Sequence, residues 1–368
     1  MRYSSKTGIF ACALFALLGV MVATMARAEI RARDITGRQV VLAEPAHRIL
    51  IDDGRYLIAL SLIHPDPVSL LSAWPRDINR IGPEAYRHYA EKFPAIEKLA
   101  KSSSSAGTFS VEQVLAAQPD IAIFSLQSKP GDDDIGRLET AGVPVAIIDF
   151  FDQPLENLEP SLRFLGEIIG RRDQAEEFIA FRRERMEAIA AKVAASSSPR
   201  PRVFLEPHAA RTDECCASPG RGNIGNYIEF AGGENIGSVL QGVTGMLNLE
   251  YVISADPQVY IATGGPHMEG TNGLLIGPGY DEQRVRETLA RVAARKGISG
   301  STAVREHRVH GLAHQLVNSP LDILTVEALA KWIRPDLFPD IDPEKTRQEI
   351  NERFLAVPLT GIYWMDFD

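Results

Sequence analysis

Arginine, aromatic and histidine side chains follow the predicted strands of this sequence and could together hold an anionic ligand. Ligands of open α/β sheets bind beyond the carboxyl ends of the strands. Arginines pair with carboxylate or catecholate oxygens in a forked geometry, and aromatic rings cover the apolar faces of a ligand. The predicted ligand-binding residues are Arg55, Tyr56, Trp74, Arg76, His208, Arg211, Arg221 and His267. Gln127, Met268, His314 and Gln315 also follow predicted strands.

Each of these residues also has a simpler interpretation. A single arginine is readily explained by a surface ion pair, and Trp74 is as readily explained by packing in the core. The concentration of such residues at strand ends favours a binding cleft over separate structural roles.

Motifs of common enzyme classes are absent from the sequence. It contains no Gly-x-Ser-x-Gly and no Gly-x-x-x-x-Gly-Lys, and the glycine-rich segment 264–279 lacks the spacing of a dinucleotide fingerprint. Asp52 and Asp53 are adjacent, and no carboxylate is identifiable opposite them for glycoside hydrolysis. We therefore predict reversible binding, with no catalytic residue and no cofactor. A secreted α/β hydrolase is the alternative from another class.

The histidines and cysteines do not form a recognised metal motif. The eight histidines are scattered, and His307, His310 and His314 lack the helical register of a metal site. No metal ligands are therefore predicted, although a bare metal ion across the cleft, or haem held by Tyr56 or a cleft histidine, remains open. Three cysteines rule out a disulfide scaffold. Cys215 and Cys216 are either two buried small residues or a disulfide between neighbours.

Alternating strands and helices must position these residues. Such alternation predicts parallel sheets with right-handed crossovers, and it occurs before and after a long helix over 173–195, with a linker at 196–201. The predicted strands are 48–53, 68–72, 121–125, 144–149, 202–207, 259–265 and part of 307–314. The predicted helices are 55–63, 83–92, 110–117, 132–141, 155–170, 173–195, 224–231, 249–255, 281–295, 319–333 and 343–354.

Two segments of the sequence resemble each other. In 109–125 and in 247–264 a glutamate precedes a short helix, a proline lies seven residues later, and an apolar strand follows. This internal similarity supports two halves of similar construction.

With these segments in order, the sequence resembles the periplasmic substrate-binding proteins of ABC importers for ferric siderophores and cobalamin. The resemblance covers about 45–340 and includes 109–125, the long central helix, 230–237, 247–264 and 319–340. It implies an α/β fold of two Rossmann-like lobes with mostly parallel sheets, joined by a long rigid helix. It also implies a ligand cleft between the lobes and a small closing movement.

The resemblance further implies a cargo and a partner. The cargo would be a ferric siderophore, anionic in view of the arginines, with cobalamin, haem or a bare metal as alternatives. Glu112 and Glu250 match the glutamates that dock onto the membrane permease, and their alternative role is that of simple helix N-terminal charges. A monomer is expected.

The first residues are typical of a secretory signal. Basic residues precede an apolar run from Ile9 to about Ala26, and Ala26-Arg27-Ala28 forms a cleavage pattern. We expect export to the periplasm with cleavage after Ala28, the rival being an uncleaved anchor. The predicted organisation is a signal peptide (1–28), an N-terminal lobe (29–152), interlobe helices (153–198) and a C-terminal lobe (199–368). A net charge of −9 without a long basic run argues against nucleic-acid binding.

Overall fold

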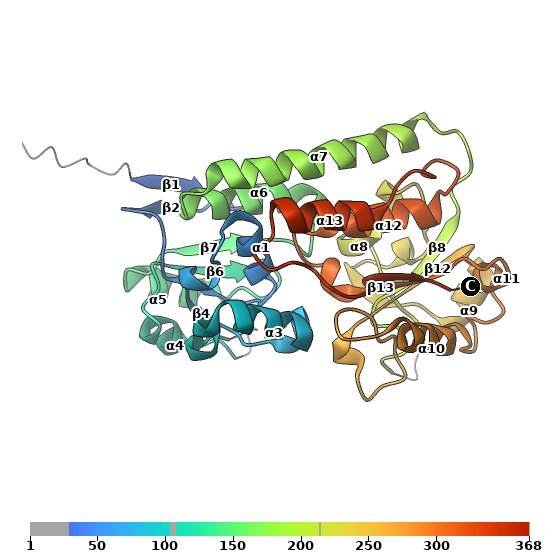
Figure 1. The fold of residues 1–368 in the computed structure, drawn as a ribbon, viewed down its shortest axis with the longest axis horizontal. Coiled ribbons are helices and arrows are strands. Elements are labelled where there is room, and N and C mark those ends of the chain that lie inside the picture. Colours follow the sequence, from blue (N-terminus) through green and yellow to red (C-terminus); the bar gives the residue numbers. More distant parts are fainter. Residues whose placement is uncertain (1–28, 104–107, 213–214, 368) are drawn as a thin grey trace, which may run out of the picture.

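A computed structural model describes residues 29–103, 108–212 and 215–367, and the expected signal segment lies outside this part of the chain. The protein has two α/β lobes, each built on a five-stranded sheet, so the predicted fold class is confirmed. Helices pack on the sheets, and one long helix runs along the same side of both lobes (Figure 1). Within the described residues, no helix has both the length and the hydropathy needed to cross a bilayer.

The first sheet is entirely parallel, with strand order β5-β4-β3-β6-β7. Its strands are almost wholly apolar because helices cover both of its faces. The strands are β3 (Ile49–Ile51), β4 (Leu71–Trp74), β5 (Ala100–Lys101), β6 (Ile121–Ser125) and β7 (Val145–Ile148). The helices of this lobe are α1 (Tyr56–Ile63), α2 (Ile78–Ile81), α3 (Pro83–Lys92), α4 (Val111–Ala116) and α5 (Asp132–Thr140).

One predicted strand of this lobe is misplaced. Residues 68–70 form a 3-10 helix, and the strand begins only at Leu71 and continues to Trp74. The apolar run 68–72 satisfied the strand pattern because such a short run does not distinguish a buried turn of helix from a strand.

The second sheet has the order β10-β8-β12-β13-β14 and ends in an antiparallel strand. Its strands are β8 (Arg202–Glu206), β10 (Glu234–Asn235), β12 (Val259–Gly264), β13 (Val309–Ala313) and β14 (Trp364–Asp366). Its helices are α8 (Asn223–Phe230), α9 (Leu249–Ala255), α10 (Glu282–Ala293), α11 (Thr302–Arg305), α12 (Asp322–Ile333) and α13 (Pro343–Arg353). Two small antiparallel pairs, β1 (Ile30–Arg33) with β2 (Gln39–Leu42) and β9 (Ala217–Pro219) with β11 (Thr244–Met246), complete the strands.

The lobes are joined by α6 (Pro154–Ile168) and α7 (Arg172–Ala195). At the usual rise per residue, the 24 residues of α7 extend roughly 36 Å. Phe178, Phe181, Met186 and Ile189 are buried, as their helical spacing predicts.

A buried ion pair fixes α7 against the second lobe. The Arg182 guanidinium donates to both carboxylate oxygens of Asp322, at 2.8 and 2.7 Å, and both side chains are almost inaccessible to solvent. The Tyr227 hydroxyl donates to the same carboxylate at 2.8 Å, and Glu159 of α6 accepts from Arg182 at 3.2 Å. Side chains of α6, α7, α8 and α12 therefore meet at one buried ion pair.

The C-terminal segment contacts both lobes. After α13, Phe354 packs edge-on against Phe178 of α7, and the Ala356 backbone N–H donates to the Ser61 carbonyl of α1. Lys92 of α3 donates to the Ala356 carbonyl. The chain then returns to the second lobe, where β14 pairs with β13. The sequence analysis did not predict this course.

Replacing Arg182 should destabilise the protein strongly. Arg182→Met would leave the buried Asp322 without its cation, at a cost of about 3–5 kcal/mol in the free energy of unfolding. Arg183→Met is the matched control, because the side chain of Arg183 is 48% exposed and pairs with Glu159 at the surface; we expect a loss below about 1 kcal/mol. Urea denaturation measures the free energy of unfolding of both variants. Equal losses in Arg182→Met and Arg183→Met would show that the buried pair does not hold α7 in place.

Candidate functional site

A cavity of about 560 Å³ lies between the two lobes. Arginine and histidine side chains make up most of its polar wall, and both lobes contribute to it. The residues from the first lobe are Arg55, Arg80, Gln127 and Phe151, and those from the second are His208, Arg211, His267, His314, Gln315 and Asn318.

Asp53 anchors two arginines on the first-lobe wall. Arg55 donates to it from Nε at 2.9 Å and from a terminal nitrogen at 2.6 Å, and Arg80 forms a second ion pair with the same carboxylate. Burial alone would raise the pKa of Asp53, but the two arginines lower it to about 2. One carboxylate thus orients two cations, and part of their positive charge remains for a ligand.

The neighbouring Asp52 has a different environment. Its carboxylate accepts from the Ser125 backbone N–H at 3.0 Å and from the Ser128 hydroxyl at 2.8 Å. Burial raises its pKa to about 7, and the Asp53 charge acts in the same direction. Asp52 therefore joins the ends of β3 and β6 beneath the cleft, and it is Asp53 that carries the fixed negative charge.

Three imidazoles form the second-lobe wall. His208 Nδ1 lies 2.7 Å from His267 Nε2, and the His208 and His314 rings have centroids 3.9 Å apart. Thr263 of β12 orients them, because its hydroxyl accepts from the His208 backbone N–H at 3.0 Å and lies 2.9 Å from His314 Nδ1. His208 has φ of 52°, a left-handed conformation that few non-glycine residues adopt outside functional sites.

These imidazoles are neutral at pH 7. Burial, reinforced by the nearby His267 and Arg211, lowers the pKa of His208 to about 4. Burial also lowers the pKa of His267, and it lowers the pKa of His314 well below the usual value. Neutral rings offer N–H donors and nitrogen lone pairs. In the described residues, no set of three or more His, Cys, Asp or Glu side chains is arranged to hold a metal ion.

Half of the residues predicted to bind ligand line the cavity, namely Arg55, His208, Arg211 and His267. The other half do not line it. Tyr56 is buried edge-on against Phe150, and Trp74 is buried and stacks on Tyr86. The structure thus gives the two aromatic residues packing contacts.

The remaining two arginines point to backbone carbonyls elsewhere. Arg76 donates to the carbonyls of Glu97 and Leu99, and Arg221 donates to that of Ser238. Arg80, Phe151 and Asn318 line the cavity and were not predicted. Phe151 could have been found, because it lies two residues after the predicted strand 144–149. Arg80 gave no such signal, since it lies in the four-residue helix α2.

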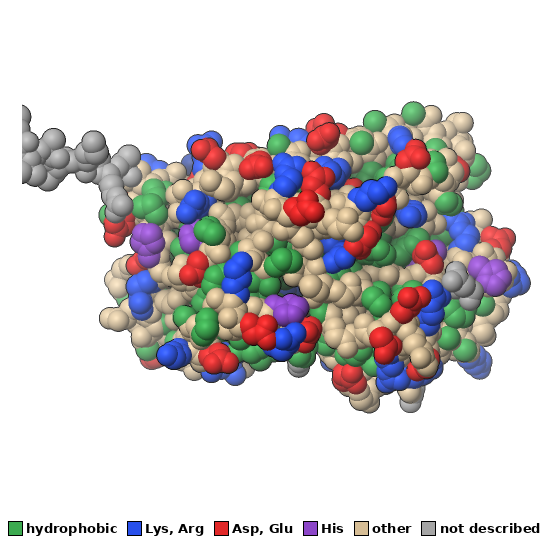
Figure 2. Space-filling model, in the orientation of Figure 1, with side chains coloured by type: hydrophobic (Ala, Val, Ile, Leu, Met, Phe, Trp, Pro, Cys, Tyr) green, Lys and Arg blue, Asp and Glu red, His purple; other side chains and the backbone are tan. Residues whose placement is uncertain are grey.

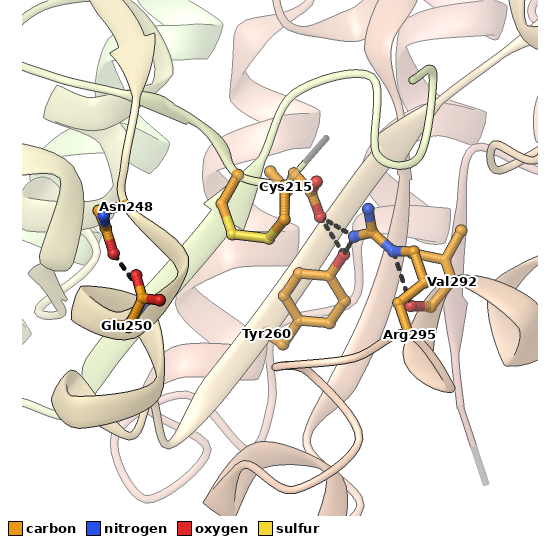
Figure 3. The surroundings of a disulfide bond; sticks show 8 residues. Cys215, Asn248, Glu250, Tyr260, Val292 and Arg295 are labelled. Atoms are coloured by element: carbon orange, nitrogen blue, oxygen red, sulfur yellow. Dashed lines mark hydrogen bonds and ion pairs between the residues drawn. A yellow bond between two sulfur atoms is a disulfide. The ribbon is translucent and has the colours of Figure 1, made fainter. Parts of the chain in front are cut away.

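Cys215 and Cys216 form a disulfide, which resolves the alternative that the sequence left open. Figure 3 shows it beside Arg295, which pairs with Glu206 of β8 and with the Tyr260 hydroxyl. Cys216 is fully buried. Cys215 is half-buried and lines a separate cavity of about 500 Å³ in the second lobe. The disulfide therefore lies outside the lining of the cleft.

Comparisons with known proteins agree with this geometry. A family model described as "Periplasmic binding protein" matches residues 63–316. The TroA-like periplasmic binding protein FepB from Veillonella parvula superposes with a TM-score of 0.81 at 24% identity, over 92% of this chain and 100% of that one. The molybdate-bound MolA of Haemophilus influenzae gives 0.68 at 16% identity, over 90% and 99%. A periplasmic heme binding protein from Pseudomonas aeruginosa gives 0.57 at 20% identity, over 88% and 99%.

The histidine wall should make stability fall in acid. The pKa of His208 is about 4 in the folded protein and about 6.5 for an ordinary histidine, as in the unfolded chain. As the pH falls from 6.5 toward 4, the unfolded state therefore takes up a proton that the folded state does not, and the free energy of unfolding decreases. His208→Asn should therefore lose less unfolding free energy than the wild type between pH 6.5 and 4. His47→Asn, a change at an exposed histidine, should keep the wild-type slope. Urea denaturation between pH 6.5 and 4 measures the free energy of unfolding of each variant. If this free energy falls with pH as steeply in His208→Asn as in the wild type, the low pKa of His208 is contradicted.

Proposed function

The chain belongs to the periplasmic binding protein family, and from this premise we propose that it captures an anionic ferric chelate of siderophore type. Binding proteins of this kind deliver their ligand to the permease of an ABC importer. The observation that carries the proposal is the meeting of Arg55 and Arg80 from one lobe with Arg211 from the other around a single polar cavity.

The three arginines suit a complex that displays oxygen atoms. Guanidinium groups bind carboxylate and catecholate oxygens with two parallel hydrogen bonds. The side chain of Arg211 is exposed and makes no hydrogen bond or ion pair with the described residues, so its guanidinium donors are available to a ligand. The neutral imidazoles add N–H donors, and about 560 Å³ is a usual volume for a small-molecule site.

Other cargoes fit this wall less well. Haem and cobalamin present large apolar surfaces, yet Phe151 is the one aromatic residue of the lining outside the histidines. A small oxyanion such as molybdate is the second candidate, since the same arginines would bind it. Among the described residues, the lining contains no serine, cysteine or carboxylate to act as a nucleophile or a carboxylate base, which supports a binding role over hydrolysis.

We propose that Glu112 and Glu250 dock onto the permease. Each occupies the first turn of an exposed helix, α4 and α9, and both helices lie on the side of the molecule away from α7 (Figure 1). One turn after each glutamate is an exposed apolar residue, Leu115 at 36% and Ile253 at 51%. On the face drawn in Figure 2, acidic and basic side chains are interspersed over the surface.

Export and cleavage after Ala28 remain a prediction, because that segment lies outside the described residues. The family is periplasmic, which supports it. We propose that the mature chain acts as a monomer.

Removing Arg211 should weaken ligand binding. Isothermal titration with ferric citrate, a ferric catecholate and a ferric hydroxamate, beside haem, cobalamin, nickel with histidine, and molybdate, identifies the cargo. We expect Arg211→Met to reduce affinity for an anionic ferric chelate by about tenfold to a hundredfold, since charge-assisted hydrogen bonds are lost. Arg221→Met, which alters an arginine of the same lobe outside the cavity, should bind as the wild type does. Binding of haem or cobalamin alone would contradict the proposal.

Reversing both docking charges should stop transport and leave binding intact. The double variant Glu112→Lys with Glu250→Lys is expected to abolish uptake of the labelled chelate into cells, with an unchanged dissociation constant in solution. Asp173→Lys with Glu344→Lys is the control, because it reverses two first-turn carboxylates on α7 and α13, away from the proposed docking side. Normal uptake by the first variant would refute docking through these glutamates.

A further inference from the structure

Gln315 places a buried amide where the two lobes meet. It lies two residues after β13, in a short 3-10 helix, and is 7% exposed. Its side chain lines the cleft and also a separate cavity of about 30 Å³, formed mainly by α1, α3 and the segment after α13. The residue therefore separates the ligand cleft from the interior of the lobe junction.

Two glycines make room for this amide. A Cβ at Gly82 of the first lobe would lie 3.0 Å from Gln315 Nε2, and one at Gly277 would lie 3.1 Å from Oε1. Both glycines have positive φ, 92° and 117°, which other residues rarely adopt. The space between Gly82 of the first lobe and Gly277 of the second lobe forms a narrow slot. The planar amide of Gln315 lies in this slot.

Neither polar atom of the amide is paired. Within the described residues, Nε2 and Oε1 of Gln315 are both buried and have no hydrogen-bond partner. Burying an unpaired amide destabilises a fold, and methionine would fill a similar volume without that cost. Other described side chains with an unpaired buried atom, such as Ser72, Thr325 and Glu327, lie outside the cleft lining, whereas Gln315 belongs to it. The position of the amide therefore indicates partners that arrive with the ligand.

We propose that Gln315 is a ligand-binding residue that selects for oxygen-bearing cargo. Its amide turns toward the cleft, where Nε2 donates to a ligand oxygen and Oε1 accepts from a ligand hydroxyl or a coordinated water. An apolar ligand of the same size would leave the amide unpaired and is rejected on that ground. The slot includes Gly82, so movement of the amide also changes the contact between the lobes. This inference rests on the proposed function, because it assigns a further contact at the same site.

The test compares Gln315→Met with a matched control, Thr325→Val. Thr325 on α12 is fully buried with an unpaired hydroxyl, and it lies outside the cleft lining. Both changes remove an unpaired polar group at nearly constant volume, so both should raise the Tm of the ligand-free protein by about 2 °C. In titrations with ferric citrate and a ferric catecholate, Gln315→Met should bind about tenfold more weakly and Thr325→Val should bind as the wild type does.

The outcomes separate this inference from the proposed function. Unchanged affinity in Gln315→Met, or a Tm below that of the wild type, would overturn the role of Gln315 while leaving ferric chelate binding in place. If the wild type binds molybdate and no ferric chelate, the proposed cargo is wrong, and the same comparison with molybdate still decides the role of the amide. A second variant, Gln315→Leu, should reproduce the loss of affinity.

Discussion

The bidentate pair between Arg182 and Asp322 fixes the interlobe helices against the second lobe, and the position of that lobe relative to the first depends on these helices. Both side chains are out of contact with solvent, where neither charge is tolerable without the other. Tyr227 and Glu159 complete the pairing, so α6, α7, α8 and α12 are fixed relative to one another. A ligand site shared between lobes needs such fixation, because a displacement of one lobe separates the donors on one wall from those on the other.

The cleft combines arginines on both walls with neutral histidines on one of them. On one side, Asp53 holds Arg55 and Arg80 and neutralises part of their charge. On the other, burial keeps His208, His267 and His314 uncharged. Under the proposed function, this combination would attract an anion without the mutual repulsion that fully charged histidines would add. The choice between anionic ligands would then depend on where the guanidinium and imidazole N–H donors lie, rather than on the total positive charge of the cleft.

Most elements of the fold could be predicted from the sequence, and some of the site could not. Strand β6 and helix α9 match their predicted bounds because a continuous apolar strand and an Asn-capped helix are strong local signals. Trp74 did not reach the cavity because its strand starts later than predicted, so Trp74 lies inside the strand and packs against Tyr86. A shift along a strand changes which face a side chain occupies. The contact between His208 and His314 arises from distant segments, and spacing in sequence does not report it.

The course of the last residues restricts how this molecule gives up its cargo. After α13 the polypeptide returns to α1 through Ala356, and it then re-enters the second sheet as β14. The lobes are therefore tethered by the tail as well as by α6 and α7, and a wide hinge opening would have to strip the tail from α1. As long as the tail stays on α1, release of a ligand is therefore restricted to a slight parting of the lobes.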